Sequence, residues 1–218
     1  MYQVGIDIGS SAAKTVVLQD GEIWKTMEMA TGFSSRKTAD EIYHWLEREQ
    51  VIREDIRYGA TGYGRVSVPY ADKVITEITC HGKGAWKLFG KDGVVIDIGG
   101  QDTKGIVLKN GRVMKFVMND KCSAGTGKFL EVMTNRLGLT QRELSELASK
   151  GEGVTISSMC TVFAESEVIS LIGKGTSREN IAYGVVESVA VKVAQLISQL
   201  DGTHYFLTGG LCEDEYMI

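Results

Sequence analysis

The sequence predicts an α/β protein of two lobes, each built on a copy of one βββαβα unit. Residues 5–23 and 95–113 match without a gap, so that Asp7 aligns with Asp97. A repeat of this kind indicates a duplicated structural unit. The segments between and after the two copies carry apolar residues at helical spacing. The expected lobes are residues 1–90 and residues 91–218.

Each copy is predicted to form three consecutive strands. A tight turn at Gly9 or Gly99 separates the first two strands, and an Asp-Gly or Asn-Gly hairpin separates the second from the third. Three further elements are expected after the first copy: a helix over residues 37–49, a strand over residues 55–60 and an apolar element from residue 74.

Four helices, a strand and a tight turn are predicted after the second copy. They are, in order, a helix near Cys122, a helix capped by Thr140, a helix opened by Cys160, a helix over residues 177–200, a strand over residues 204–208 and the turn Gly209-Gly210. A last helix is expected to start at Glu213. Because the chain ends at Ile218, before that helix is complete, we expect the second lobe to be truncated at its C-terminal end.

Composition and charge argue against several classes of function. A net charge of −4 over 218 residues argues against a nucleic-acid groove or a polybasic membrane contact. No run of eighteen apolar residues occurs, and the first residues lead directly into a strand pattern without a signal peptide. We expect a cytoplasmic protein that binds neither nucleic acid nor a membrane.

The repeated turn is suited to binding phosphate. In each copy an aspartate ends a buried strand and is followed by glycine, small residues and a lysine (Lys14 or Lys104). Backbone N–H groups in such a turn can bind phosphate oxygens, and the aspartate can hold a hydrated Mg²⁺. Two turns facing each other would hold one polyphosphate from both sides; the alternative is two ordinary hairpins with a buried aspartate. Residues 123–128 are not a P-loop, because Phe129 stands where Ser or Thr must bind Mg²⁺.

Cys122 and Cys160 each precede an apolar-periodic segment, which predicts that each lies at a helix N-terminus. Unpaired N–H groups and the positive end of the helix dipole favour a thiolate there. In a protein expected to be cytoplasmic, two such cysteines favour metal or redox chemistry over a disulfide. Cys80 and His81 are adjacent and cannot both point at one ion from a helix, so we expect them to pack instead.

Seven segments together carry a family resemblance. They are DIGSSAAK (7–14), ATGYGR (60–65), EITCHGKGA (77–85), DIGGQDTK (97–104), NDKCSAGTGKFLE (119–131), SSMCTVFAESEV (157–168) and FLTGG (206–210). The whole chain resembles the activators of 2-hydroxyacyl-CoA dehydratases, in the BadF/BadG/BcrA/BcrD ATPase family. The resemblance implies the actin-like ATPase fold of the acetate and sugar kinase, Hsc70 and actin superfamily, with a ribonuclease-H-like first lobe.

The resemblance also implies a cofactor, partners and a reaction. It implies a homodimer with one [4Fe–4S] cluster bridging the subunits, ligated by Cys122 and Cys160 of each chain. A reduced ferredoxin or flavodoxin would supply one electron, and ATP hydrolysis would drive its transfer to a 2-hydroxyacyl-CoA dehydratase or a benzoyl-CoA reductase-like partner in an anaerobic cell. Four thiolates suffice for such a cluster. A single-chain site that also used Cys80 and Cys212 would supply four as well.

Site residues are assigned by the same resemblance. Asp7 and Asp97 would lie near Mg²⁺ through water, and Gln101 or Asp102 would position the hydrolytic water. The residues expected to bind ATP or ADP are Ser10, Ser11, Ala12, Ala13, Lys14, Gly99, Gly100, Gln101 and Lys104 at the phosphates, and Gly209 and Gly210 at the adenosine. We expect the second phosphate turn and the Cys122 helix to share a lobe, separated by one strand pair.

Two other classes of function stay open. A sugar or N-acetylhexosamine kinase of the same fold would need a sugar pocket with a general-base aspartate, and it would have no use for paired cysteines. A non-catalytic, nucleotide-dependent switch is the other, because an incomplete C-terminal end would impair the ATP site. The sequence does not identify which acyl-CoA enzyme would be activated.

Overall fold

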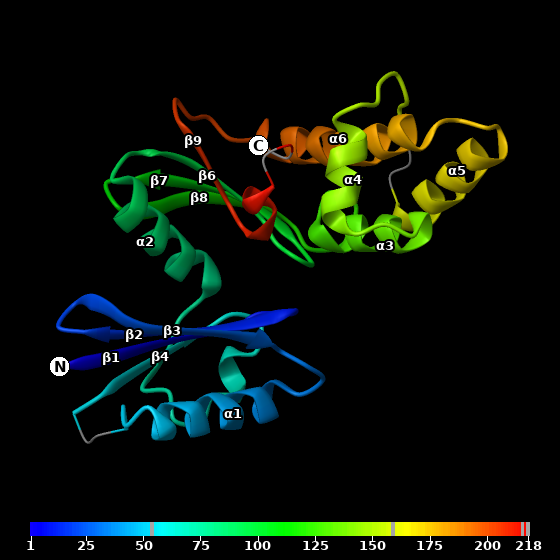
Figure 1. The fold of residues 1–218 in the computed structure, drawn as a ribbon. Coiled ribbons are helices and arrows are strands. Elements are labelled where there is room, and N and C mark those ends of the chain that lie inside the picture. Colours follow the sequence, from blue (N-terminus) through cyan, green and yellow to red (C-terminus); the bar gives the residue numbers. More distant parts are fainter. Residues whose placement is uncertain (53–54, 158–159, 215, 217–218) are drawn as a thin grey trace. The chain divides into compact units, whose positions relative to one another are not determined.

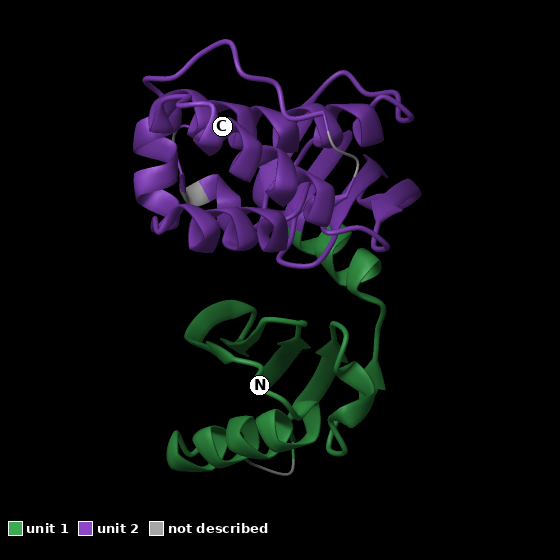
Figure 2. Cartoon of the chain, turned by 90° about the vertical axis from the view of Figure 1, so that its right-hand side faces the viewer, with its two compact units in different colours: residues 1–84 green, residues 85–218 purple. Residues whose placement is uncertain are grey.

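The computed structural model describes residues 1–52, 55–157, 160–214 and 216, in two compact units (Figures 1 and 2). Unit 1 spans Met1–Gly84 and unit 2 spans Ala85–Ile218. The division falls inside helix α2 (Glu77–Phe89), a few residues before the boundary that the repeat alone suggests.

Unit 1 is a five-stranded sheet in the order β3-β2-β1-β4-β5, with helix α1 packed on one face (Figure 1). The first three strands are antiparallel, whereas β4 runs parallel to β1 and β5 parallel to β4. Its elements are β1 (Tyr2–Ile8), β2 (Ala12–Gln19), β3 (Glu22–Ala30), α1 (Ser35–Arg48), β4 (Arg57–Thr61), the 3₁₀ turn η1 (Arg65–Ser67) and β5 (Lys73–Val74).

The core of unit 1 follows from strand alternation meeting an amphipathic helix. Val4 and Ile6 on β1 are buried, and they share a core cluster with Ile42 and Leu46 of α1. Helix α1 begins after Ser34, whose hydroxyl accepts a hydrogen bond from the Lys37 N–H at 3.3 Å. The helix expected over residues 37–49 is therefore confirmed.

Unit 2 has a four-stranded sheet in the order β8-β7-β6-β9, in which β9 runs parallel to β6. The helices expected to follow Cys160 and to run over residues 177–200, and the helix capped by Thr140, are all present. The elements are β6 (Gly93–Ile98), β7 (Thr103–Lys109), β8 (Arg112–Asn119), α3 (Gly127–Leu137), α4 (Gln141–Ala148), α5 (Thr161–Gly173), α6 (Arg178–Ile197), β9 (Tyr205–Thr208) and the 3₁₀ helix η2 (Gly210–Glu213). Instead of starting a helix, Glu213 ends η2, and residues 215, 217 and 218 lie outside the described part of the chain.

Helix α6 is the central element of the unit 2 core. Val185 and Val189 are buried in a cluster with Phe129 of α3 and Leu144 of α4. Within the described residues, α6 is also the one helix long and apolar enough to cross a membrane by length and composition. Its buried apolar positions are those of a core helix, because they pack against the sheet and its neighbouring helices.

The two sheets repeat each other residue by residue. Asp7 pairs across the strands with Lys14 and Thr61, and Asp97 pairs in the same way with Lys104 and Thr208. Both copies have a register shift between the same two positions of the second strand, Val17/Leu18 and Val107/Leu108. The duplicated unit expected from the sequence is confirmed.

Candidate functional site

The first phosphate turn, residues 9–11, joins β1 to β2. The Gly9 N–H donates to the Ala12 carbonyl at 3.0 Å. A Cβ at Gly9 would lie 2.8 Å from that oxygen, so the turn requires glycine. Ser10 and Ser11 are exposed at its tip, whereas the Ala13 side chain is fully buried in the core. Ala13 can therefore serve a bound phosphate through its backbone alone.

The second turn closes in the same way but adds a carboxylate. The Gly99 N–H donates to the Asp102 carbonyl at 2.8 Å, and Gly100 and Gln101 are exposed at the tip. Asp102 occupies the position of Ala12 in the first turn. A side-chain oxygen thus stands in the second turn where the first has only a methyl group.

Lys104 is buried between two carboxylates. Its Nζ lies 2.6 Å from Asp102 Oδ1 and 3.5 Å from Asp97 Oδ2, and the lysine and Asp97 are each only 7% exposed. Buried charges persist only when they are paired in this way. The aligned Lys14 differs, because its exposed ammonium lies 3.9 Å from Glu28. The sequence aligned these lysines as equivalents, but only Lys104 is held at the turn by carboxylates.

A Thr-Gly pair follows the parallel strand beside each aspartate. Gly62 and Gly209 have φ values of +84° and +99°, and a Cβ at Gly62 would collide with Asp7 Oδ1. The Thr208 hydroxyl lies 3.3 Å from Asp97 Oδ1. In both units the carboxyl ends of the parallel strands thus bring the Asp, the phosphate turn and the Thr-Gly pair to one edge of the sheet.

The pair Thr61-Gly62 is not among the site residues expected from the sequence, which include only Gly209 and Gly210 from this part of the duplicated unit. The signal was present, since in each copy a Thr-Gly pair stands at the end of a short strand that pairs with the aspartate strand. Thr61 Oγ1 is buried and has no hydrogen-bond partner among the described residues. It is a hydroxyl that a bound ligand or water could satisfy.

Cys122 does not lie at the start of the helix that follows it. Helix α3 begins at Gly127 with Thr126 as its N-cap residue. The N–H groups of Gly127 and Lys128 donate to the Gly99 and Gly100 carbonyls at 2.9 and 2.8 Å. The expectation that this helix start favours a Cys122 thiolate is therefore wrong, because the phosphate turn already uses the first N–H groups of α3.

Cys160 does lie at a helix N-terminus, as expected. It is the N-cap residue of α5, with φ −125° and ψ 142°. The hydroxyls of Ser123 and Thr161, each next to one cysteine, form a hydrogen bond of 2.7 Å. This bond ties the Cys122 loop to the start of α5, so both half-buried cysteines lie in one region of unit 2.

Two nearby thiols match half of the ligand set of an iron–sulfur cluster. The described residues include no group of three or more His, Cys, Asp or Glu side chains placed to hold a metal ion. Cys212 lies in η2, where burial and then the negative charge of Asp97 raise the pKa of its thiol. The region of Cys122 and Cys160 therefore offers two of the four thiolates that such a cluster needs.

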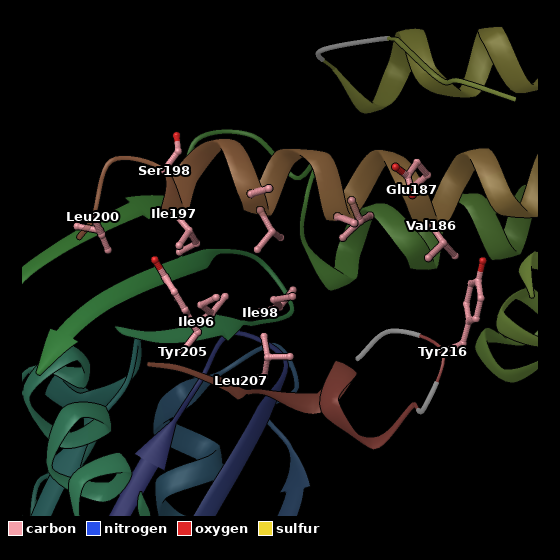
Figure 3. Close-up of a pocket in the computed structure, with 14 residues that line it drawn as sticks. Ile96, Ile98, Val186, Glu187, Ile197, Ser198, Leu200, Tyr205, Leu207 and Tyr216 are labelled. Carbon is pink, nitrogen blue, oxygen red and sulfur yellow. The ribbon is translucent and has the colours of Figure 1, made fainter. Parts of the chain in front are cut away.

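An apolar cavity of about 600 Å³ lies between α6 and the unit 2 sheet. Figure 3 shows Ile96, Ile98 and Leu207 of the strands facing Val186 and Ile197 of the helix. Ile96 and Ile98 flank Asp97 on β6, so they point to the opposite face of the sheet from its carboxylate. The cavity is therefore separate from the phosphate turn.

The model of the BadF/BadG/BcrA/BcrD ATPase family matches residues 4–218. The chain belongs to this family. It is 44% identical to the (R)-2-hydroxyglutaryl-CoA dehydratase activating ATPase of Acidaminococcus fermentans, over 98% of this chain and 84% of the relative. It is 47% identical to the activator of lactoyl-CoA dehydratase of Anaerotignum propionicum, over 90% of this chain and 77% of the relative.

Solved structures of family members have the same fold. Component A of the Acidaminococcus fermentans dehydratase superposes with a TM-score of 0.90 at 43% identity, covering 100% of this chain and 86% of that one. The activator of the 2-hydroxyisocaproyl-CoA dehydratase from Clostridium difficile, solved with ADPNP, gives 0.88 at 38% identity, with coverages of 100% and 83%. A glucokinase of the ROK family from Streptomyces griseus gives 0.58 at 16% identity, with coverages of 100% and 86%. The actin-like ATPase fold shared with sugar kinases is thus confirmed.

Proposed function

We propose that this protein is an ATP-hydrolysing activator that passes single electrons to a 2-hydroxyacyl-CoA dehydratase or a related benzoyl-CoA reductase-like enzyme. The observation that carries the proposal is the direct backbone bonding between the second phosphate turn and α3, beside the loop that holds Cys122. The relatives with 44% and 47% identity are named as such activators.

ATP and its Mg²⁺ are assigned to the two turns and to the Thr-Gly pairs. In the proposal, Ser10, Ser11 and the backbone of residues 12–14 bind phosphate from the first turn, and Gly99, Gly100 and Lys104 bind it from the second. Asp7 and Asp97 hold the hydrated Mg²⁺, and Gln101 or Asp102 orients the attacking water. Gly209 and Gly210 lie against the adenosine. The relative solved with ADPNP supports nucleotide binding by this family.

Cys122 and Cys160 are assigned as the protein ligands of a [4Fe–4S] cluster shared by two copies of the chain. When bound, the cluster would supply one-electron chemistry. Support for a second copy comes from α5, where large apolar side chains remain exposed directly after Cys160. They are Val162, Phe163, Ile169 and Ile172, each between 48% and 69% exposed. By helical spacing Val162, Ile169 and Ile172 share one face of α5, and Phe163 is next to Val162 in the sequence. An apolar face of this kind is typical of a protein interface, and the dimer would bring four thiolates together.

ATP can drive the transfer only through unequal binding to two arrangements of the protein. Gly99 and Gly100 are suited to this role, because their carbonyls hold the first N–H groups of α3. A shift of the turn on ATP binding or hydrolysis would therefore move α3. A reduced ferredoxin or flavodoxin is the proposed electron donor, and a cluster at such an interface would be oxygen-sensitive, as expected in an anaerobic cell.

A sugar kinase is not favoured. The glucokinase likeness at 16% identity shows the fold alone. A kinase of this type would also have no use for two thiol side chains held in one region by the bond between Ser123 and Thr161. A nucleotide-dependent switch without electron transfer leaves the same two thiols without a role.

The test is iron and sulfide analysis with EPR on anaerobically purified protein. The wild type should be brown, with about two irons per chain because two chains share a four-iron cluster, and should give a reduced-cluster signal after dithionite. Cys122→Ser and Cys160→Ser should lose the colour and the iron. Cys80→Ser, at a half-buried cysteine of unit 1, is the matched control and should keep both.

Phosphate release measures the ATPase part of the proposal independently. Iron retained in Cys122→Ser would refute the ligand assignment. A colourless wild type that transfers phosphate from ATP to a hexose would instead identify a sugar kinase.

A further inference from the structure

The cysteine loop of unit 2 is the segment of residues 120–126, between β8 and α3, that contains Cys122. Two facing side chains hold this loop through hydrogen bonds to its backbone. Thr103 at the start of β7 is the cross-strand partner of Asn119 at the end of β8. Asn119 Nδ2 donates to the carbonyls of Cys122 at 2.9 Å and Ala124 at 3.0 Å. The Thr103 hydroxyl donates to the Gly125 carbonyl at 2.6 Å. Three carbonyls of the loop thus depend on one cross-strand pair.

The first copy of the duplicated unit lacks this pair. In unit 1 the equivalent cross-strand partners are Ala13 and Met29, which carry no hydrogen-bonding side chain. The turns beside them are otherwise closed by the same glycine hydrogen bond. The polar pair is therefore not needed to build the strand pairs or the turn. It is present in the copy that is followed by a cysteine loop.

Thr103 also links the loop to the phosphate turn. It directly follows Asp102, whose carbonyl closes the turn on Gly99 and whose carboxylate binds Lys104. Thr103 is 1% exposed, and a buried hydroxyl or carbonyl without its partner is costly. A displacement of Asp102 would therefore be transmitted to Gly125 through the Thr103 hydrogen bond.

We propose that Thr103 and Asn119 form a positioning clamp that transmits rearrangement of the second phosphate turn to Cys122. The inference rests on the proposed function and deepens it. Beyond the clamp, the hydrogen bond between Ser123 and Thr161 carries the displacement to the start of α5 and thus to Cys160. The nucleotide state would then set the environment of both thiols.

The test uses the full chain without a cluster and the nucleotide analogue ADPNP. The rate of Cys122 alkylation by iodoacetamide is followed by mass spectrometry with and without ADPNP, and ADPNP binding is measured by calorimetry. In the wild type, ADPNP should change the alkylation rate several-fold. Thr103→Val, which keeps the shape of the side chain but removes the hydroxyl, should bind ADPNP as the wild type does and lose most of that change.

Matched variants separate positioning from a general loss of structure. Thr103→Ser restores the hydroxyl and should recover the nucleotide response. Asn119→Leu removes the second half of the clamp at a half-buried site and should also lose the response, which keeps the test decisive should Thr103→Val fold poorly. Met29→Asn, at the equivalent position of unit 1, should leave the response unchanged.

Two results would overturn the clamp. One is a wild type that binds ADPNP without any change in Cys122 alkylation. The other is a set of folded Thr103→Val and Asn119→Leu variants with the full wild-type response. Failure of the wild type to bind ADPNP at all would overturn the proposed function, and the clamp with it.

Discussion

Lys104 and Lys14 hold aligned positions in the two copies but have different physical environments. The aspartate, glycine and lysine spacing was readable from the sequence, because the repeat has no gap. The different environments of the two lysines were not predicted, although they follow from the identity of one neighbouring residue. Asp102 supplies a carboxylate 2.6 Å from the Lys104 ammonium, whereas Ala12 at the matching position supplies none.

Replacing Lys104 by Met should destabilise unit 2 strongly. The change leaves Asp97 and Asp102 as neighbouring carboxylates without their shared cation, and loss of one partner of a buried ion pair costs about 3–5 kcal/mol. Lys14→Met is the matched control, because an exposed pair contributes at most about 1 kcal/mol. Urea unfolding monitored by circular dichroism measures both. Equal losses for the two variants would contradict the buried pairing of Lys104.

At the scale of single elements, sequence patterns located helices better than they located helix starts. Thr140 caps α4 as expected, because an N-cap signal is local in sequence, and the structure adds a capping box between Thr140 and Glu143. The start of α3 was placed too early. Its first N–H groups donate to the carbonyls of residues 99 and 100, and two strands separate these residues from the helix in the sequence. Apolar periodicity cannot predict a tertiary hydrogen bond of this kind.

The α4 capping box should make stability depend on pH. Glu143 accepts hydrogen bonds from the Thr140 N–H at 2.7 Å and from its hydroxyl at 2.8 Å, and these bonds lower the pKa of the carboxyl below its ordinary value of 4.5. A lowered folded pKa stabilises the protein fully above the unfolded value, and the stabilisation is lost as pH falls through the folded value.

Glu143→Gln should therefore be less stable than the wild type at pH 7, and the difference should shrink as pH falls below 4.5. Thermal unfolding over a pH series measures it. Glu146→Gln on the same helix is the control, because its exposed pair with Arg142 has no capping role. A wild-type advantage that persisted unchanged at low pH would rule out ionised Glu143 as its source.

At the scale of the whole molecule, duplication explains both what was predictable and what was not. The three consecutive strands and the aspartate position are shared by the two units, so one repeated pattern predicted both copies. The residues that differ between the copies show where the second unit has specialised. Asp102, Thr103 and Asn119 replace Ala12, Ala13 and Met29, and all three lie between the phosphate turn and the cysteine loop.

Assembly into a dimer should depend on the apolar surface of α5. Phe163 is 69% exposed two residues into that helix, and burying its side chain against a second copy would contribute about 1.5–3 kcal/mol. Phe163→Glu should therefore weaken the dimer by roughly ten- to a hundred-fold, since 1.4 kcal/mol is about tenfold in affinity, and should reduce the iron content because each chain alone offers two of the proposed ligands.

Sedimentation equilibrium under anaerobic conditions measures this change, with iron analysis on the same samples. Phe33→Glu is the matched control, because Phe33 is a fully exposed phenylalanine of unit 1, whereas α5 belongs to unit 2. It should leave assembly and iron unchanged. If Phe163→Glu remained a dimer with full iron, the two copies would have to meet through a surface other than the exposed apolar side chains of α5.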